Sequence, residues 1–182
     1  MAICRDGGLN RANRLFWEYA KTFQLLGGSQ VERDVWQNIE ETELALRRLV
    51  EHRYVDTWPR DLTARVRQSI GDESWRKIQD NVKKSLKKYP YSKDKVQKGI
   101  IHHLYLGQLM ILMVETSGWP LFQHLFRDKR QLQDLMSAIM PVRNDRAHFA
   151  QVPQKELDRC RIACDDLLVI ASAEATRLGI PE

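Results

Sequence analysis

Hydrophobic residues recur every three or four positions along most of the chain, which is the spacing that places them on one face of an α-helix. The first such stretch runs from Arg11 to Leu26 and ends at Gly27-Gly28. Ser29 is predicted to cap a second helix that extends to about His52. The apolar stripe of this second helix consists of Val35, Ile39, Leu46, Leu49 and Val50.

Glycine and proline residues divide the middle of the chain into further helical segments. A short helix is predicted over residues 60–70, with Gly71 at its end and Asp72 as the cap of the next helix. That next helix is amphipathic and is predicted to end before Pro90. Its apolar stripe consists of Trp75, Ile78, Val82 and Leu86. Ser92 is then predicted to cap a long helix that reaches Glu115 or Thr116.

The last third of the chain follows the same pattern. Gly118-Trp119-Pro120 forms a break, and an apolar helix follows over residues 132–140. Pro141 is predicted to kink or end that helix, because proline lacks the N–H that the helix interior requires. Pro153 and Gly179 are predicted to begin and end a final helix of about 25 residues.

The pattern predicts an all-α fold, a helical bundle with short connections. No stretch alternates hydrophobic and polar residues over several positions, so no sheet is expected. The 182 residues, 43% of them hydrophobic and 29% charged, suit one globular domain with a terminal extension. We assign residues 1–28 to an N-terminal helical extension and residues 29–182 to the main domain.

The formal net charge of +5 permits a polyanionic partner without requiring one. The distribution of lysines is more informative than their number. Seven of them fall within sixteen residues: Lys83, Lys84, Lys87, Lys88, Lys93, Lys95 and Lys98. This cluster has two readings of equal weight, a solvated helix face with its loop or a surface that contacts RNA.

Several common chemistries lack any sequence signature in this chain. There is no phosphate-binding glycine loop, no dinucleotide fingerprint, no CxxC and no HExxH, so no cofactor and no metal are expected. The three cysteines are Cys4, Cys160 and Cys164, an odd number without paired spacing, which argues against a disulfide framework. The most apolar stretch, 100–114, is too short to span a bilayer. We therefore expect a cytoplasmic protein without membrane contact.

One polar segment between two apolar helices stands apart from this pattern. It runs from Met140 to Phe149 and contains Arg143, Asn144 and His148. It resembles the signature of the HEPN superfamily, in which an Arg, four to six residues and then a His open a late helix. In the commonest form of that signature Asn follows the Arg and a small residue precedes the His, as Asn144 and Ala147 do here.

A second match to the bare Arg and His spacing occurs at Arg47 and His52. This pair lies inside a regular amphipathic helix and lacks the Asn, the small residue and the proline. We therefore predict a structural role for it. The resemblance to HEPN domains covers residues 35–178, but only the segment from Arg143 to His148 is specific.

The resemblance implies a metal-independent endoribonuclease that leaves a 2′,3′-cyclic phosphate and a 5′-hydroxyl. His148 would move protons, because an unperturbed imidazole titrates near neutral pH. Arg143 would stabilise the charge of the phosphorane. Asn144 would position His148 or the phosphate. Arg146 is a further candidate for RNA contact, together with the lysines that precede Pro90.

The resemblance also implies a homodimer, in which two copies of the motif face one cleft. Five residues of helix correspond to about 140° of net rotation, so one motif on a straight helix does not easily surround one phosphate. The expected setting is a toxin or phage-defence effector with a regulatory or antitoxin protein partner. Some HEPN toxins carry a Tyr two residues after the His, which a partner enzyme modifies, but this chain has Ala150 there.

Two other functions remain open at this point. The chain would also fit a non-catalytic HEPN-like module that binds RNA or protein, or an unrelated helical adaptor. The most discriminating observation is whether the purified protein cleaves RNA in EDTA and loses that activity with His148→Ala.

Overall fold

The computed structural model describes residues 30–88, 99–147 and 151–180, and within these ranges every regular element is helical. This confirms the all-α class and the helical bundle. The predicted helix over 11–26 lies outside the described residues. The elements in chain order are α2 (Gln30–Thr57), α3 (Leu62–Ile70), α4 (Asp72–Lys88), the 3₁₀ turn η2 (Ile100–His103), α6 (Leu106–Val114), α7 (Trp119–Phe122), the 3₁₀ turn η3 (Gln123–Leu125), α8 (Lys129–Ala147) and α9 (Gln154–Leu178).

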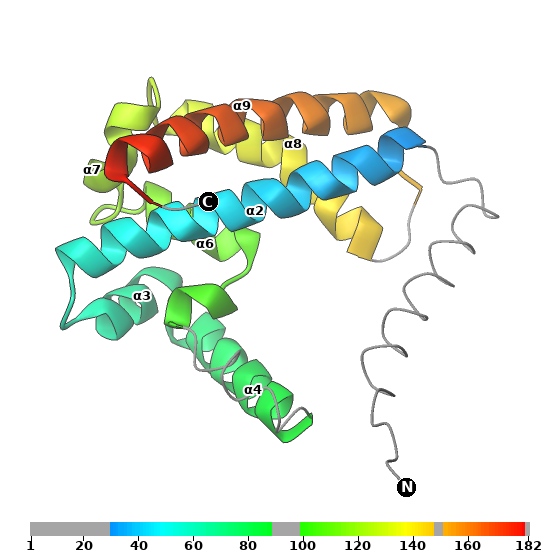
Figure 1. The fold of residues 1–182 in the computed structure, drawn as a ribbon. Coiled ribbons are helices and arrows are strands. Elements are labelled where there is room, and N and C mark those ends of the chain that lie inside the picture. Colours follow the sequence, from blue (N-terminus) through cyan, green and yellow to red (C-terminus); the bar gives the residue numbers. More distant parts are fainter. Residues whose placement is uncertain (1–29, 89–98, 148–150, 181–182) are drawn as a thin grey trace, which may run out of the picture.

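The long helices α2, α8 and α9 form the main body of the bundle (Figure 1). Helix α9 packs along both α2 and α8, and α6 packs against α2, α3 and α8. Helices α3 and α4 pack against each other, and α4 projects away from the main body (Figure 1). Helix α4 therefore offers a long exposed surface beside the bundle.

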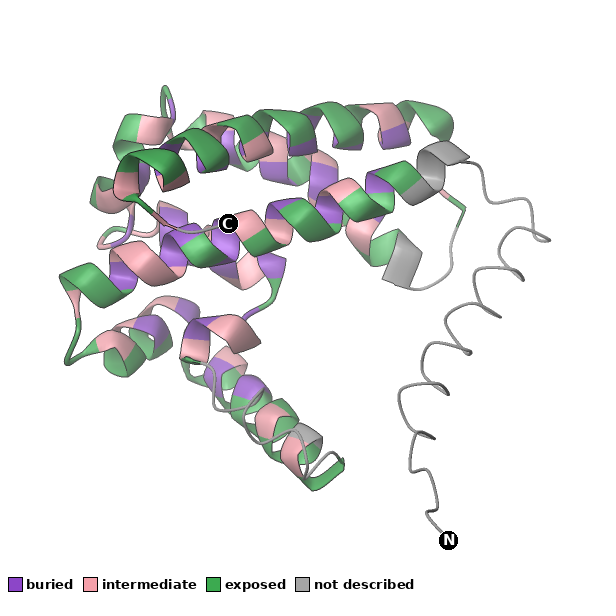
Figure 2. Ribbon diagram, viewed as in Figure 1, coloured by how far each residue is buried: buried purple, intermediate pink, exposed green. Residues whose placement is uncertain are grey.

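The core consists of the apolar stripes that face the centre of the bundle, which are purple in Figure 2. All five residues of the predicted α2 stripe are buried: Val35, Ile39, Leu46, Leu49 and Val50. In α4, Trp75 and Ile78 are buried, whereas Val82 and Leu86 are only partly so. The apolar side chains of α4 become more exposed toward its C-terminal end, because that half of the helix projects from the bundle.

The predicted long helix ending at Glu115 or Thr116 is wrong in its described part, which begins at Gly99. The chain forms the short turn η2, becomes extended at Leu104 (φ −78°, ψ 146°) and Tyr105, and only then enters α6. On one continuous helix, Leu104 and Leu106 would lie about 200° apart, on opposite faces. The break allows both side chains to be buried, at 2% and 0% exposure.

Helix α8 does not end at Pro141, as the sequence allowed, but continues through it to Ala147. Proline at this position removes the N–H that would bond to the carbonyl of Ser137, and its ring crowds that carbonyl. Val142 is buried in the core, which holds the next turn of the helix in place. Arg143 and Asn144 are therefore at the end of α8 rather than at the start of the last helix.

Two glycines end helices where the sequence predicted. Gly71 (φ 80°) ends α3, and Gly179 (φ 67°) ends α9, both in backbone conformations that favour glycine. Asp72 does not cap α4 but is its first residue, and its carboxylate accepts a hydrogen bond from Arg67 Nε at 2.6 Å. The final helix has 25 residues, as predicted.

No helix in the described ranges combines the length and the hydropathy that a membrane-spanning segment requires.

Candidate functional site

The last turns of α8 carry the described part of the HEPN-like motif. Val142 is 4% exposed and faces the core, so the residue after it turns toward the surface. Arg143 is half-buried, and its Nη1 lies 3.5 Å from Oδ1 of the exposed Asn144, the limit of a hydrogen bond. Among the residues that the structure describes, no carboxylate pairs with Arg143.

Tyr105 lies directly beside Arg143, although the two residues are 38 positions apart. The Cζ atom of Arg143 is 5.9 Å from the centroid of the Tyr105 ring, which is a cation–π distance. Tyr105 is 48% exposed, and its hydroxyl accepts a hydrogen bond from Nδ2 of Asn81 at 2.8 Å. Asn81 belongs to α4, so Tyr105 joins the end of α8 to the lysine-rich helix.

The main chain at the start of α6 holds Tyr105 in this position. Its backbone N–H donates to Oε1 of Gln108 at 2.9 Å, and the N–H of Gln108 donates to the Tyr105 carbonyl at 2.8 Å. Sequence reasoning missed Tyr105, because an aromatic residue inside an apolar stretch predicts burial. The only signal was its neighbours, Leu104 and Leu106, which cannot both be buried on one straight helix.

The remaining predicted site residues are distributed as follows. Lys83, Lys84, Lys87 and Lys88 all lie exposed on α4. His148 lies outside the described residues, and Arg146 belongs to α8 without a described side chain. The structure thus brings Arg143, Asn144, Tyr105 and Asn81 together, with the α4 lysines on the helix that carries Asn81.

Arg47, the alternative match in the sequence, occupies a different environment from Arg143. It is 8% exposed, and its guanidinium donates to the Ile101 carbonyl at 2.9 Å and pairs with Glu43 at 2.5 Å. His52 lies one turn further along α2 and pairs with Asp56 at 3.2 Å. The carbonyl of Ile101 belongs to η2, so Arg47 fastens this turn to α2. These contacts agree with the structural role predicted for Arg47.

A buried carboxylate joins α2, η3 and α9 near the end of α9. Glu174 is 3% exposed and accepts two hydrogen bonds at 2.7 Å from Arg177. It also pairs with His124 at 3.0 Å and with Arg53 of α2. The hydrogen bonds from Arg177, followed by those from His124 and Arg53, lower the pKa of Glu174 to about 2. The cluster is a structural clamp that binds the end of α9 to α2.

The Glu174 clamp predicts a loss of stability in acid. A carboxyl whose folded pKa lies below its unfolded value of 4.5 stabilises the fold above that value. This stabilisation is lost as the pH falls through the folded pKa, so the free energy of unfolding should decrease between about pH 5 and about pH 2. The fall in the pKa of Glu174 from 4.5 to about 2 corresponds to roughly 3 kcal/mol.

Urea unfolding of the parent protein and Glu174→Gln, measured at several pH values, tests this prediction. The variant should be less stable at pH 7 and show a smaller slope between pH 5 and pH 2 than the parent. Glu156→Gln is a matched control, because this glutamate is on the same helix and its side chain is 43% exposed in its ion pair with Arg159. Equal slopes for parent and Glu174→Gln would contradict the assignment.

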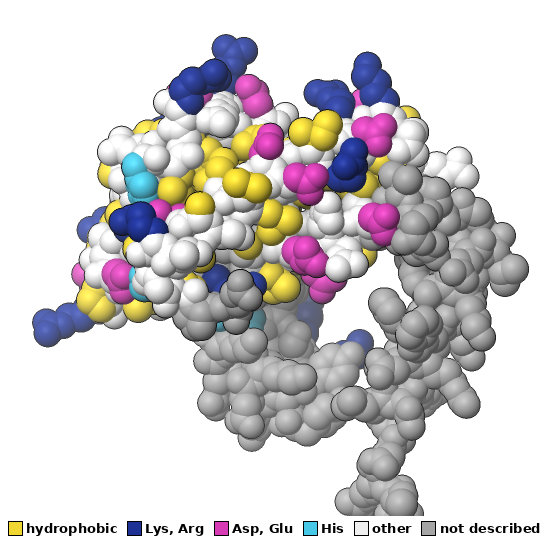
Figure 3. Space-filling view, turned by 45° about the horizontal axis from the view of Figure 1, so that its top comes forward, with side chains coloured by type: hydrophobic (Ala, Val, Ile, Leu, Met, Phe, Trp, Pro, Cys, Tyr) yellow, Lys and Arg dark blue, Asp and Glu magenta, His cyan; other side chains and the backbone are white. Residues whose placement is uncertain are grey.

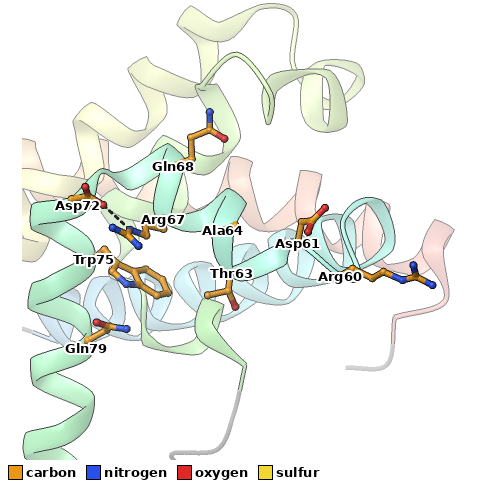
Figure 4. Close-up of a pocket in the computed structure, with 9 residues that line it drawn as sticks. All are labelled: Arg60, Asp61, Thr63, Ala64, Arg67, Gln68, Asp72, Trp75 and Gln79. Carbon is orange, nitrogen blue, oxygen red and sulfur yellow. Dashed lines mark hydrogen bonds and ion pairs between the residues drawn. The ribbon is translucent and has the colours of Figure 1, made fainter.

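An open pocket of about 660 Å³ lies between α3 and α4 (Figure 4). Trp75 lines it, with Thr63 and Gln79 nearby and the Arg67–Asp72 ion pair above the ring. Its charged residues are two arginines and two aspartates: Arg60, Arg67, Asp61 and Asp72. Because these charges balance, the pocket is poorly suited to a phosphate, and it contains none of the predicted site residues.

The face of the molecule that Figure 3 turns forward is also poorly suited to a polyanion. Hydrophobic and acidic side chains occupy its middle, and most of its Lys and Arg side chains lie toward the rim. The exposed hydrophobic residues of α2 and α9 include Leu44, Ile162 and Val169. A basic surface beside an exposed aromatic ring is instead found at α4, Tyr105 and Arg143.

No group of three or more His, Cys, Asp or Glu side chains within the described ranges is arranged to hold a metal ion. Cys160 and Cys164 are both buried in α9, and neither is in a disulfide.

Comparisons with family models, with curated proteins and with solved structures found no match to this chain.

Proposed function

We propose that this protein is a metal-independent endoribonuclease whose site is built around Arg143 and His148. The observation that carries the proposal is the position of Arg143 in the bundle. Its guanidinium is half-buried at the end of α8, has no carboxylate partner among the described residues and lies against an exposed tyrosine. An arginine so placed is suited to a phosphate, because its planar fork matches two phosphate oxygens.

The contrast with Arg47 supports the choice between the two matches in the sequence. Both arginines are followed five residues later by a histidine, but Arg47 already bonds to Glu43 and to the Ile101 carbonyl. A substrate phosphate would have to displace both of these partners. Arg143 requires no such exchange.

The proposed reaction follows from the chemistry of the two side chains and the resemblance to HEPN domains. The ribose 2′-hydroxyl attacks the adjacent phosphorus, and the bond from phosphorus to the 5′ oxygen breaks. His148 moves the proton between the attacking and leaving oxygens, and Arg143 stabilises the negative charge of the phosphorane. The products are a 2′,3′-cyclic phosphate and a 5′-hydroxyl.

The proposal includes a homodimer in which two motifs face one cleft. The segment from Arg143 to Ala147 is helical, so Arg143 and the residues after it diverge around α8 rather than converge on one point. The resemblance further leads us to propose a toxin or phage-defence role in the cytoplasm, with a regulatory or antitoxin protein as partner.

Incubation of the purified protein with RNA in excess EDTA tests the proposal. We expect cleavage to proceed, and the new 3′ ends to resist end-labelling until acid opens the cyclic phosphate and a phosphatase removes the resulting monophosphate. The same preparation should sediment as a dimer. Cleavage that requires Mg²⁺ and leaves a 5′-phosphate would contradict the mechanism, and a monomer that cleaves RNA would contradict the two-motif site.

A second candidate function is a non-catalytic module that binds RNA. The arrangement of Tyr105 beside α4 favours it, because these residues can contact RNA whether or not His148 transfers a proton. A folded dimer that binds RNA and cleaves none would select this alternative.

A further inference from the structure

Tyr105 combines exposure with a fixed position, and this combination is what a base-stacking residue requires. Nearly half of its surface is accessible, yet its hydroxyl is bonded to Asn81 and its backbone is fixed at the start of α6. An exposed aromatic ring that is already ordered loses little conformational freedom when it binds a flat partner. The side chains placed against it, Arg143 and Asn81, are polar rather than apolar, which distinguishes it from the ring of a protein interface.

The basic surface of α4 continues from Asn81 along one face of the helix. Lys84 is exposed and follows Asn81 by three residues, so it shares the face that meets Tyr105. Lys77 precedes Asn81 by four residues on the same face, but it is paired with Glu73 at 2.6 Å. Lys84 is therefore the lysine of this face that is best placed to bind a phosphate beside Tyr105.

We infer that Tyr105 stacks an unpaired RNA base beside Arg143, while the Lys84 face of α4 binds the adjoining phosphates. This inference rests on the proposed function, since it places the strand on the same arginine. Within one nucleotide the base and its phosphate are joined through a single sugar, so a base on Tyr105 brings a phosphate within reach of Arg143. Both faces of a base inside a duplex are already stacked, so the contact selects single-stranded RNA.

Binding measured without cleavage tests the inference separately from the proposed function. The full chain carrying His148→Ala is titrated into a fluorescent unstructured RNA of about twelve nucleotides, a length within the range that single-strand-binding sites cover. The same RNA annealed to its complement serves as the double-stranded probe. Tyr105→Leu should weaken binding of the single strand by about 5- to 150-fold, the usual range for loss of one base stack. Duplex affinity should change by less than about twofold.

Three further variants separate the contribution of the Tyr105 ring from that of its hydroxyl and from that of positive charge in general. Tyr105→Phe keeps the ring and should bind within about threefold of the parent, since a base stacks on either ring. Lys84→Ala should reduce the slope of log affinity against log salt by about 0.7, the value for one phosphate contact on a single strand. Lys77→Ala removes the same charge from the same face, but this lysine is already paired with Glu73, so the slope should change less.

A 2-aminopurine base in the RNA reports stacking directly, through quenching of its fluorescence, and remains informative if Tyr105→Leu folds poorly. Quenching should occur with the His148→Ala chain and with the same chain carrying Tyr105→Phe. Absence of quenching with both, or single-strand affinity unchanged in a folded Tyr105→Leu, would overturn the inference. Tyr105-dependent binding, together with a failure of the chain that retains His148 to cleave RNA, would leave the inference intact and overturn the proposed nuclease. If Tyr105→Leu, made in the chain that retains His148, still cleaved RNA and bound it with unchanged affinity, the proposed nuclease would stand and the inference about Tyr105 would be overturned.

Discussion

Arg143→Ala and His148→Ala should each abolish most RNA cleavage while the helical bundle remains folded. Loss of a proton-transfer group typically reduces the rate by about 10²–10⁴-fold, and loss of a donor that stabilises transition-state charge by about 10²–10³-fold. Asn144→Ala should have a smaller effect, since its proposed role is positioning. Single-turnover cleavage of a labelled RNA measures the rates, and circular dichroism verifies the fold.

The bundle offers matched controls for both substitutions. Arg65 lies over the ring of Trp58 at 5.7 Å, as Arg143 lies over Tyr105 at 5.9 Å, so Arg65→Ala removes an arginine from a similar environment. Its rate of cleavage should remain within about threefold of the parent, the scatter expected of a substitution outside the site. His52→Ala removes the histidine of the other sequence match. If His52→Ala stopped cleavage in a folded protein and Arg143→Ala did not, the assignment of the motif would be wrong.

Gly118→Ala should be among the most destabilising single substitutions in the described part of the protein. A Cβ atom at Gly118 would lie 1.7 Å from the carbonyl oxygen of Leu112 and 2.7 Å from the hydroxyl of Tyr54. Gly118 has an ordinary helical conformation (φ −80°, ψ −41°), so the cost is steric rather than torsional. The oxygen that it meets accepts a hydrogen bond at 2.7 Å from Tyr54, which is buried.

Relief of this clash would move the backbone after α6 and strain or break the Tyr54 hydrogen bond. Overpacking of this kind costs about 1–3 kcal/mol, and a buried polar group without its partner adds about 1–3 kcal/mol. We therefore expect Gly118→Ala to lower the free energy of unfolding by roughly 3 kcal/mol or more. For a domain of this size, that is a fall in Tm of about 6–12 °C.

Gly107→Ala is the control for this prediction. The nearest atom to its Cβ is Cε of Met140 at 3.2 Å, the far end of a flexible side chain that can move aside. Alanine also favours the helical backbone of α6 over glycine by up to about 1 kcal/mol. Thermal unfolding should therefore place Gly107→Ala within about 1 kcal/mol of the parent. Equal stability of Gly118→Ala and the parent would show that the turn before α7 adjusts freely.

Hydrophobic spacing and local backbone preference determined the class of this fold and most of its helices. The α2 stripe from Val35 to Val50 is buried as its spacing predicts, and Gly71 and Gly179 end α3 and α9 as glycine does at a positive φ. These features depend on neighbours within about one helical turn, which the sequence displays directly. The Arg143 motif was likewise found from local sequence, by its resemblance to a family signature.

Tertiary packing decided what local preference could not. The chain breaks between η2 and α6 because Leu104 and Leu106 both reach the core, and α8 continues through Pro141 because Val142 is buried after it. The contact of Arg143 with Tyr105, and of Tyr105 with Asn81, joins three segments that are distant in sequence. Such contacts depend on how whole helices pack, and helical spacing describes only which side of each helix faces inward. The sequence therefore determined the helices and the candidate motif, whereas the packing of α4, α6 and α8 determined which side chains lie beside Arg143.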